Sequence, residues 1–213
     1  LGKTKPNLVI HCAAIVDVDA CEGDIGLATK LHFETTKVIA NYLECNNDRL
    51  IYISTDSVFD GKKQTPYCEF DAVSPLNVYA KTKFMGEEPV QSMSNGLVLR
   101  TNIIGWTQEA GNSFAEWILE SLIDNVSLNL FHDVYFTPLH VDKLALIIDN
   151  IIENPIDGLY RVSVKDADFK AERPKNMALD IEKIGLTLGY DFPNVADAIQ
   201  LMKRQYDNNN LPN

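Results

Sequence analysis

The feature that most constrains the fold of this chain is an alternation of short apolar segments with longer segments of helical periodicity. Apolar runs of strand length lie at Leu8–Cys12, Leu50–Ser54, Leu97–Thr101 and Leu159–Val162. Segments of helical period fall between and after them, at Ile25–Glu44, Val78–Gln91, Ser113–Asp124, Val141–Ile152 and Val195–Tyr206. This alternation is typical of a parallel sheet whose strands are joined by helices. The sequence therefore predicts an α/β fold.

Composition favours a soluble enzyme. The 213 residues are 46% hydrophobic, enough for a buried core in one domain or in one domain with a small lobe. The net charge of −11 disfavours non-specific attraction to nucleic acid or to an anionic membrane surface. No apolar run approaches the roughly 18 to 20 residues that span a bilayer, and the first residues lack the pattern of a signal peptide. We therefore expect a cytoplasmic location, with no nucleic-acid or membrane partner.

The potential metal ligands do not follow the spacing of a known metal site. Cys12, Cys21, Cys45 and Cys68 show neither CxxC nor zinc spacing, which favours reduced, mostly structural thiols. The acidic stretch from Asp17 to Asp24 lacks the pattern of a calcium loop and is expected to be a solvated helix entry. The four histidines show no HExxH spacing. We predict that the chain binds no metal.

Tyr79 and Lys83 are four residues apart in a predicted helix, so their side chains share one face. A neighbouring cation favours phenolate, which should lower the pKa of the tyrosine from about 10 towards neutral pH. Such a tyrosine can pass a proton to or from a substrate oxygen, and Thr55, at the end of a predicted strand, can hydrogen-bond the same oxygen. The pair alone is a weak signal, because chance Tyr-x-x-x-Lys pairs are common. Without it, Ser54 and Thr55 indicate only a turn.

The surrounding motifs strengthen this interpretation. The run Leu50–Gly61 is followed by Pro66-Tyr67, Glu69, Pro75–Tyr79 and Gly86-Glu87. Together these residues closely resemble the extended short-chain dehydrogenase/reductase family, and within it the dTDP-4-dehydrorhamnose reductases and related sugar-nucleotide reductases. The resemblance extends from about Lys5 to Asp180 and is most specific over residues 50–87. It implies a Rossmann-type doubly wound parallel sheet with a small C-terminal substrate lobe. Residues 1–104 and 141–153 would form the dinucleotide-binding domain, and residues 105–140 and 154–213 the lobe.

The sequence departs from the family in two places. It contains no GxGxxG turn that would cradle a pyrophosphate at a helix start. The segment Leu8–Ala14 resembles a later strand of the family's sheet, so we expect that roughly the first two βα units of that domain are missing from the sequence. Near Lys165–Glu172, about ten residues stand where the family has a helix or two.

Several predicted strand ends carry candidate binding residues. Ligands of open parallel sheets bind at the carboxyl ends of the strands, so these residues should line one cleft. The predicted cofactor set, for NADPH or NADH, is Cys12, Ala13, Ala14, Ser54, Tyr79, Lys83, Thr101 and Asn102. By resemblance, the first three would lie along the dinucleotide and Lys83 would also bond the nicotinamide ribose. The predicted substrate set, again by resemblance, is Val18, Thr55, Asp56, Ile103 and Asn112.

Three positions differ from those of the reductases. Ser57 stands where the reductases commonly have a tyrosine, and Ile103 where they have a tryptophan. Because both positions shape the sugar pocket, the identity of the sugar stays open. His32 stands where the extended family usually has an asparagine, and we assign it no catalytic role.

The function implied by the resemblance is NAD(P)H-dependent reduction of a nucleotide-linked 4-keto-6-deoxy sugar. Tyr79 would donate the proton, with Lys83 and Thr55 supporting it. A homodimer is the candidate assembly. One alternative is an epimerase or dehydratase of the same fold, although dehydratases usually place an acidic pair after the threonine and this chain has Asp56-Ser57. The other is a non-catalytic subunit resembling the regulatory subunit of methionine adenosyltransferase.

Overall fold

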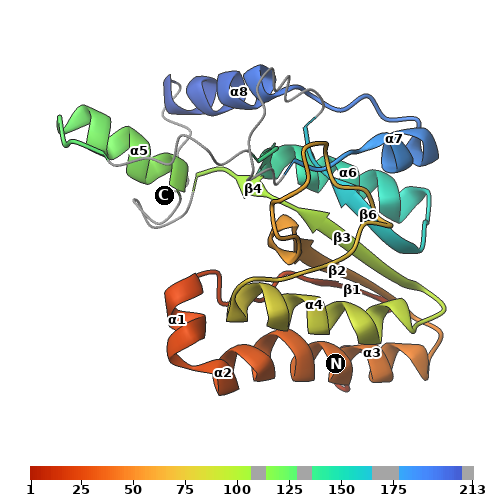
Figure 1. Cartoon of the computed structure of the whole chain (residues 1–213). Coiled ribbons are helices and arrows are strands. Elements are labelled where there is room, and N and C mark those ends of the chain that lie inside the picture. Colours follow the sequence, from red (N-terminus) through yellow and green to blue (C-terminus); the bar gives the residue numbers. More distant parts are fainter. Residues whose placement is uncertain (107–113, 129–135, 165–177, 208–213) are drawn as a thin grey trace.

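The structure is a computed structural model that describes residues 1–106, 114–128, 136–164 and 178–207, built around a central parallel sheet (Figure 1). The strands are β1 (Leu8–His11), β2 (Arg49–Thr55), β3 (Gly96–Thr101) and β6 (Gly158–Val162), adjacent in the order β1-β2-β3-β6. All three pairings are parallel. A separate short pair joins β4 (Ile103–Ile104) to β5 (Leu139–His140). The four predicted strands are confirmed; β4 and β5, of two residues each, are too short to leave a periodic signal.

The helices follow the predicted pattern with two additions. They are α1 (Val18–Gly23), α2 (Ile25–Thr29), a π-helical turn (Lys30–Glu34), α3 (Thr35–Glu44), a 3₁₀ turn (Asp56–Val58), α4 (Val78–Gln91), α5 (Phe114–Ile123), α6 (Val141–Glu153), α7 (Glu182–Leu188) and α8 (Val195–Asp207). The sequence did not predict α1 and α7, which have only six and seven residues. Ser113, the predicted start of α5, lies outside the described residues. None of the helices in the described ranges has the length and apolar character to cross a membrane.

The sheet is buried on both faces. Alternate residues of each strand point to opposite sides, and helices cover both sides. Leu50, Tyr52 and Val98 pack against residues of α3 and α4, including Ala40, Leu43 and Val90. The intervening residues, including Ile51, Ile53, Leu97 and Leu99, pack against Leu144, Ile147 and Ile151 of α6. Figure 1 shows α3 and α4 on one side of the sheet and α6 on the other. The apolar character of the strands is thus explained by burial on both sides.

The long predicted helix at residues 25–44 contains a π-helical turn in its interior. The carbonyl oxygen of His32 accepts hydrogen bonds from the hydroxyls of Thr36 (2.6 Å) and Tyr52 (3.4 Å). These side chains satisfy the carbonyl where the regular ladder is interrupted. The turn brings the His32 ring into the core, where it is completely buried. Amphipathic periodicity predicted the helix but not this irregularity.

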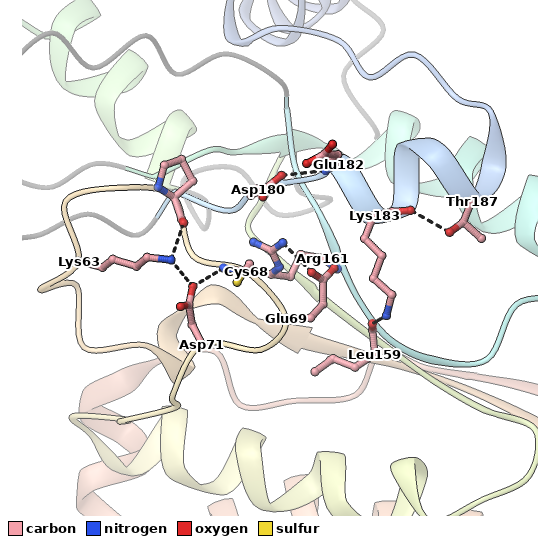
Figure 2. A network of polar contacts seen from close by, with 11 residues as sticks. Lys63, Cys68, Glu69, Asp71, Leu159, Arg161, Asp180, Glu182, Lys183 and Thr187 are labelled. Carbon is pink, nitrogen blue, oxygen red and sulfur yellow. Dashed lines mark hydrogen bonds and ion pairs between the residues drawn. The ribbon is translucent and has the colours of Figure 1, made fainter.

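Residues 59–77, which we call the clasp loop, connect the 3₁₀ turn after β2 to α4 and contact the C-terminal part of the chain. The backbone N–H of Tyr67 donates to Ala178 (2.8 Å), and the N–H of Asp180 donates to Tyr67 (3.0 Å). Figure 2 shows a second connection, in which Glu69 accepts a 2.7 Å bond from Arg161 of β6. The clasp loop therefore ties the chain between β2 and α4 to two segments far away in sequence.

Candidate active site

A cavity of about 360 Å³ lies at the carboxyl ends of β1, β2 and β3. Its volume is within the range of small-molecule sites. All but two residues of the predicted cofactor and substrate sets line this cleft. Ala13 is not among the lining residues, and Asn112 lies outside the described residues. Val16, Ile53 and Ser57 also line it. The fold thus gathers residues that are up to 91 positions apart, from Cys12 to Ile103, around one cavity.

Two capping interactions fix the start of α4, the helix that carries Tyr79. The side chain of Asn77 accepts a hydrogen bond from the N–H of Ala80 (2.8 Å). Glu22, from α1, accepts one from the N–H of Val78 (2.8 Å). These carboxyl and amide oxygens satisfy N–H groups that have no partner within the helix. The first turn of α4, and with it the phenol of Tyr79, is therefore held at the cleft.

The pKa of Tyr79 is opposite in direction to the sequence-based expectation. Burial raises it above the ordinary value of 10, while a side-chain hydrogen bond with Thr55 acts in the lowering direction. The expected net lowering is wrong for this structure, because burial of the phenol, the largest effect, raises the pKa. A raised pKa keeps the phenol protonated at neutral pH, which is the state that a proton donor requires.

Lys83 is nearly completely buried beneath the cleft. Its Nζ donates a 2.6 Å hydrogen bond to the carbonyl oxygen of Ile53 and lies 4.2 Å from the centre of the Tyr52 ring. Burial lowers its pKa to about 8, and the carboxylate of Glu87 acts in the raising direction. The side chain is therefore still largely a cation at neutral pH, held by a carbonyl and an aromatic face.

Asp56 is a buried carboxyl group behind Thr55. Its Oδ2 accepts a hydrogen bond from Asn102 (2.9 Å), and its Oδ1 accepts one from the Thr55 hydroxyl (3.2 Å). Burial raises its pKa to about 6, although these hydrogen bonds act in the lowering direction. Thr101 also lines the cleft, and its buried Oγ1 has no hydrogen-bond partner within the described parts of the chain.

We expect Asp56 to make the protein less stable as pH rises. Between about pH 4 and pH 6 the folded state keeps a proton that the unfolded chain has lost, so the free energy of unfolding falls through this window. Asp56→Asn should remove this contribution. Between pH 4 and pH 7, the free energy of unfolding should fall by about 1–3 kcal/mol more in the wild type than in the variant, as measured by urea unfolding. Asp149→Asn, at an exposed position of α6, is the control; equal pH profiles for wild type and Asp56→Asn would contradict the prediction.

Sequence reasoning missed an ion pair directly behind the cleft. Arg100 of β3 binds Glu87 of α4 through Nε to Oε1 (2.9 Å) and Nη2 to Oε2 (2.6 Å). Ser54 donates a further 2.6 Å bond to Oε1 of Glu87. Both charged side chains are at most 2% exposed. One signal could have identified the pair: an arginine within the otherwise apolar strand Gly96–Thr101, whose only plausible place is beside a buried carboxylate.

His32 connects the loop after β1 to α4, the helix that carries Tyr79. Its Nε2 accepts a hydrogen bond from the N–H of Ile15 (2.9 Å), and its Nδ1 lies 2.8 Å from the hydroxyl of Thr82. Its ring meets the Tyr79 ring edge-on, with centroids 5.9 Å apart. Burial lowers the pKa of His32 to about 4, so the ring is neutral. These contacts hold the loop after β1 against α4.

Comparison with known proteins decides the family. The model of the RmlD substrate binding domain matches residues 1–168, more than half of the chain. The chain belongs to the RmlD substrate-binding domain family. The sugar-nucleotide reductase resemblance and the Rossmann-type α/β fold are thereby confirmed.

Individual relatives of this RmlD-family chain agree. It is 34% identical to dTDP-4-dehydrorhamnose reductase of Salmonella typhimurium over 145 residues, which are 67% of this chain and 48% of the relative. It is 34% identical to methionine adenosyltransferase 2 subunit beta of Xenopus laevis over 176 residues, 79% of this chain and 52% of the relative. The chain thus spans about half the length of these curated relatives. Among solved structures, a dTDP-4-dehydrorhamnose reductase of Clostridium acetobutylicum superposes with a TM-score of 0.86 at 26% identity, covering 97% of this chain and 83% of that one.

Proposed function

We propose that the protein is an NAD(P)H-dependent reductase of a nucleotide-linked 4-keto-6-deoxy sugar. The observation that carries the proposal is the convergence of Thr55, Tyr79 and Lys83 on one cleft at the carboxyl ends of parallel strands. The named reductases among its relatives support the substrate class. The predicted division into a dinucleotide-binding part, residues 1–104 and 141–153, and a substrate lobe, residues 105–140 and 154–213, is part of the same proposal.

The residues around the cleft fit a nicotinamide cofactor. Cys12 and Ala14 are small side chains at the end of β1, where a dinucleotide can approach the backbone closely. Lys83 and Thr101 both line the cleft, and their side chains would bond ribose hydroxyls of the cofactor. When bound, NADPH or NADH supplies the hydride for the keto carbon.

The protein's own groups would handle the oxygen of the keto group. As the carbonyl accepts the hydride, its oxygen becomes an alkoxide, and the protonated phenol of Tyr79 donates its proton to that oxygen. The hydroxyl of Thr55, which hydrogen-bonds Tyr79, would hold the same oxygen in place. The cation of Lys83 would stabilise the phenolate that is left until solvent reprotonates it.

The test is the loss of NAD(P)H absorbance by the full-length protein that carries this sequence, with dTDP-4-keto-6-deoxyglucose as substrate. Turnover with one reduced cofactor would support the proposal and identify the preferred cofactor. If the cofactor binds but neither this sugar nor other nucleotide-linked keto sugars are reduced, the reductase assignment fails.

A second candidate is a regulatory subunit. The identity to the methionine adenosyltransferase subunit equals that to the reductase, at 34% over a longer stretch. An intact set of Thr55, Tyr79 and Lys83 supports catalysis over this role. Stable co-purification with a methionine adenosyltransferase catalytic subunit, without sugar reduction, would favour the second candidate.

A further inference from the structure

Lys83 and Glu87 lie four residues apart on α4, a spacing at which a lysine and a glutamate attract each other. Both side chains are buried, at 3% and 0% exposure, so their attraction is little screened by water. Nevertheless each is bonded to other groups. The ammonium donates to the carbonyl of Ile53, and the carboxylate faces β3. This separation needs a structural cause.

Arg100 provides that cause. Its guanidinium engages both carboxylate oxygens of Glu87, at 2.9 and 2.6 Å, and Ser54 donates to the oxygen that Arg100 Nε also contacts. Such a two-point contact is among the strongest hydrogen-bonded ion pairs in proteins. The carboxylate is therefore neutralised by a residue of the sheet and not by Lys83.

In the part of the chain that the structure describes, few other charges surround Lys83. Among the described residues, the titratable groups that face it are His11 of β1, Cys12 just after it, Tyr52 of β2, Asp56 of the 3₁₀ turn, His32 of the π-helical turn, and Tyr79 and Glu87 of α4. Of these, Glu87 has the strongest influence that favours the ammonium. Because Arg100 of β3 pairs with Glu87, the sheet can influence the charge of Lys83 mainly through this carboxylate.

We propose that Arg100 is a positioning residue for Lys83. By occupying both oxygens of Glu87, it keeps the carboxylate from capturing the ammonium and leaves that ammonium directed at Ile53 and the cleft. The inference rests on the proposed function only in treating Lys83 as an active-site group.

Removing either Arg100 or Glu87 should shift the pKa of Lys83 in a predictable direction. In Arg100→Met, Glu87 becomes a buried carboxylate without its cation, and Lys83, one turn away, is the nearest replacement. The Lys83 pKa should then rise above its wild-type value of about 8. In Glu87→Gln, Arg100 becomes an unpaired cation nearby, so the Lys83 pKa should fall. In the double variant both charges are gone, so the Lys83 pKa should lie between those of the two single variants.

A neighbouring ion pair gives a matched control. Arg161 of β6 is the strand partner of Arg100, is 1% exposed, and bonds Glu69 of the clasp loop at 2.7 Å (Figure 2). Arg161→Met therefore breaks a pair of similar burial and length whose carboxylate lies on the clasp loop instead of α4. It should destabilise the fold as Arg100→Met does, but leave the pKa of Lys83 unchanged.

The experiment is an NMR titration of full-length protein labelled with ¹³C at lysine Cε, with the Lys83 resonance assigned by its loss in Lys83→Met. A raised pKa in Arg100→Met, a lowered one in Glu87→Gln and an unchanged one in Arg161→Met would support the proposal. The same Lys83 pKa in Arg100→Met and wild type would overturn it. If Arg100→Met does not fold, Glu87→Gln decides, and an unchanged Lys83 pKa there overturns the proposal. Because no turnover is measured, this result is independent of whether the protein reduces a keto sugar.

Discussion

Replacing Tyr79 with phenylalanine should lower kcat for keto-sugar reduction by roughly 10²–10⁴-fold, the usual contribution of a positioned general acid. The variant keeps the ring, and therefore its edge-on contact with His32, but loses the hydroxyl that donates the proton. With its pKa raised above 10, the wild-type phenol is protonated at neutral pH and can donate, whereas the variant has no proton to give. KM for the cofactor should change little. Steady-state kinetics with varied NAD(P)H and saturating keto sugar measure both quantities.

Tyr160→Phe is the matched control for this experiment. Tyr160 is a buried tyrosine of β6 that packs in the core on the α6 side of the sheet, outside the residues that line the cleft. Its variant should retain the wild-type kcat. Full turnover by Tyr79→Phe would show that another group protonates the product and would remove the central residue from the mechanism.

Alanine at Gly86 should destabilise the fold strongly, since this glycine allows α4 to contact the π-helical turn. A Cβ there would lie 2.4 Å from the backbone oxygen of His32 and 2.5 Å from the hydroxyl of Tyr52. The first contact is with backbone, so relief requires one helical segment to move. Overpacking of this kind costs about 1–3 kcal/mol or more, and a loss of that size should lower Tm by several degrees. Thermal and urea unfolding measure the change.

The same substitution should also reduce activity, because α4 carries Tyr79 and Lys83 one to two turns before Gly86. Gly185→Ala is the control: this glycine is also helical, but its Cβ would meet only Tyr190 and Phe192, at 3.6 and 4.0 Å. There the higher helix propensity of alanine should leave stability equal or slightly increased. Equal Tm values for Gly86→Ala and wild type would show that the two helical segments adapt to each other freely.

Local patterns were sufficient for most of the secondary structure. The strands at residues 50–54 and 97–101 are apolar on both faces, and the helix at 78–91 carries its own cap at Asn77, so short-range signals determine them. The same signals placed Thr55 at a strand end and Tyr79 with Lys83 on one helix. Short elements such as α1 and β4 left no comparable signal, because their stability comes from contacts with distant residues.

The sequence by itself determined the α/β class, the order of strands and helices, and the set of residues that could meet at the strand ends. Only the tertiary structure decided how their charges are arranged. Lys83 lies next to Glu87 on the same helix, yet Glu87 bonds Arg100 from a strand, and burial raises the pKa of Tyr79 where local spacing predicted a decrease. The physical reason is that hydrophobic periodicity is a local property, whereas desolvation and ion pairing depend on which distant side chains share a buried space.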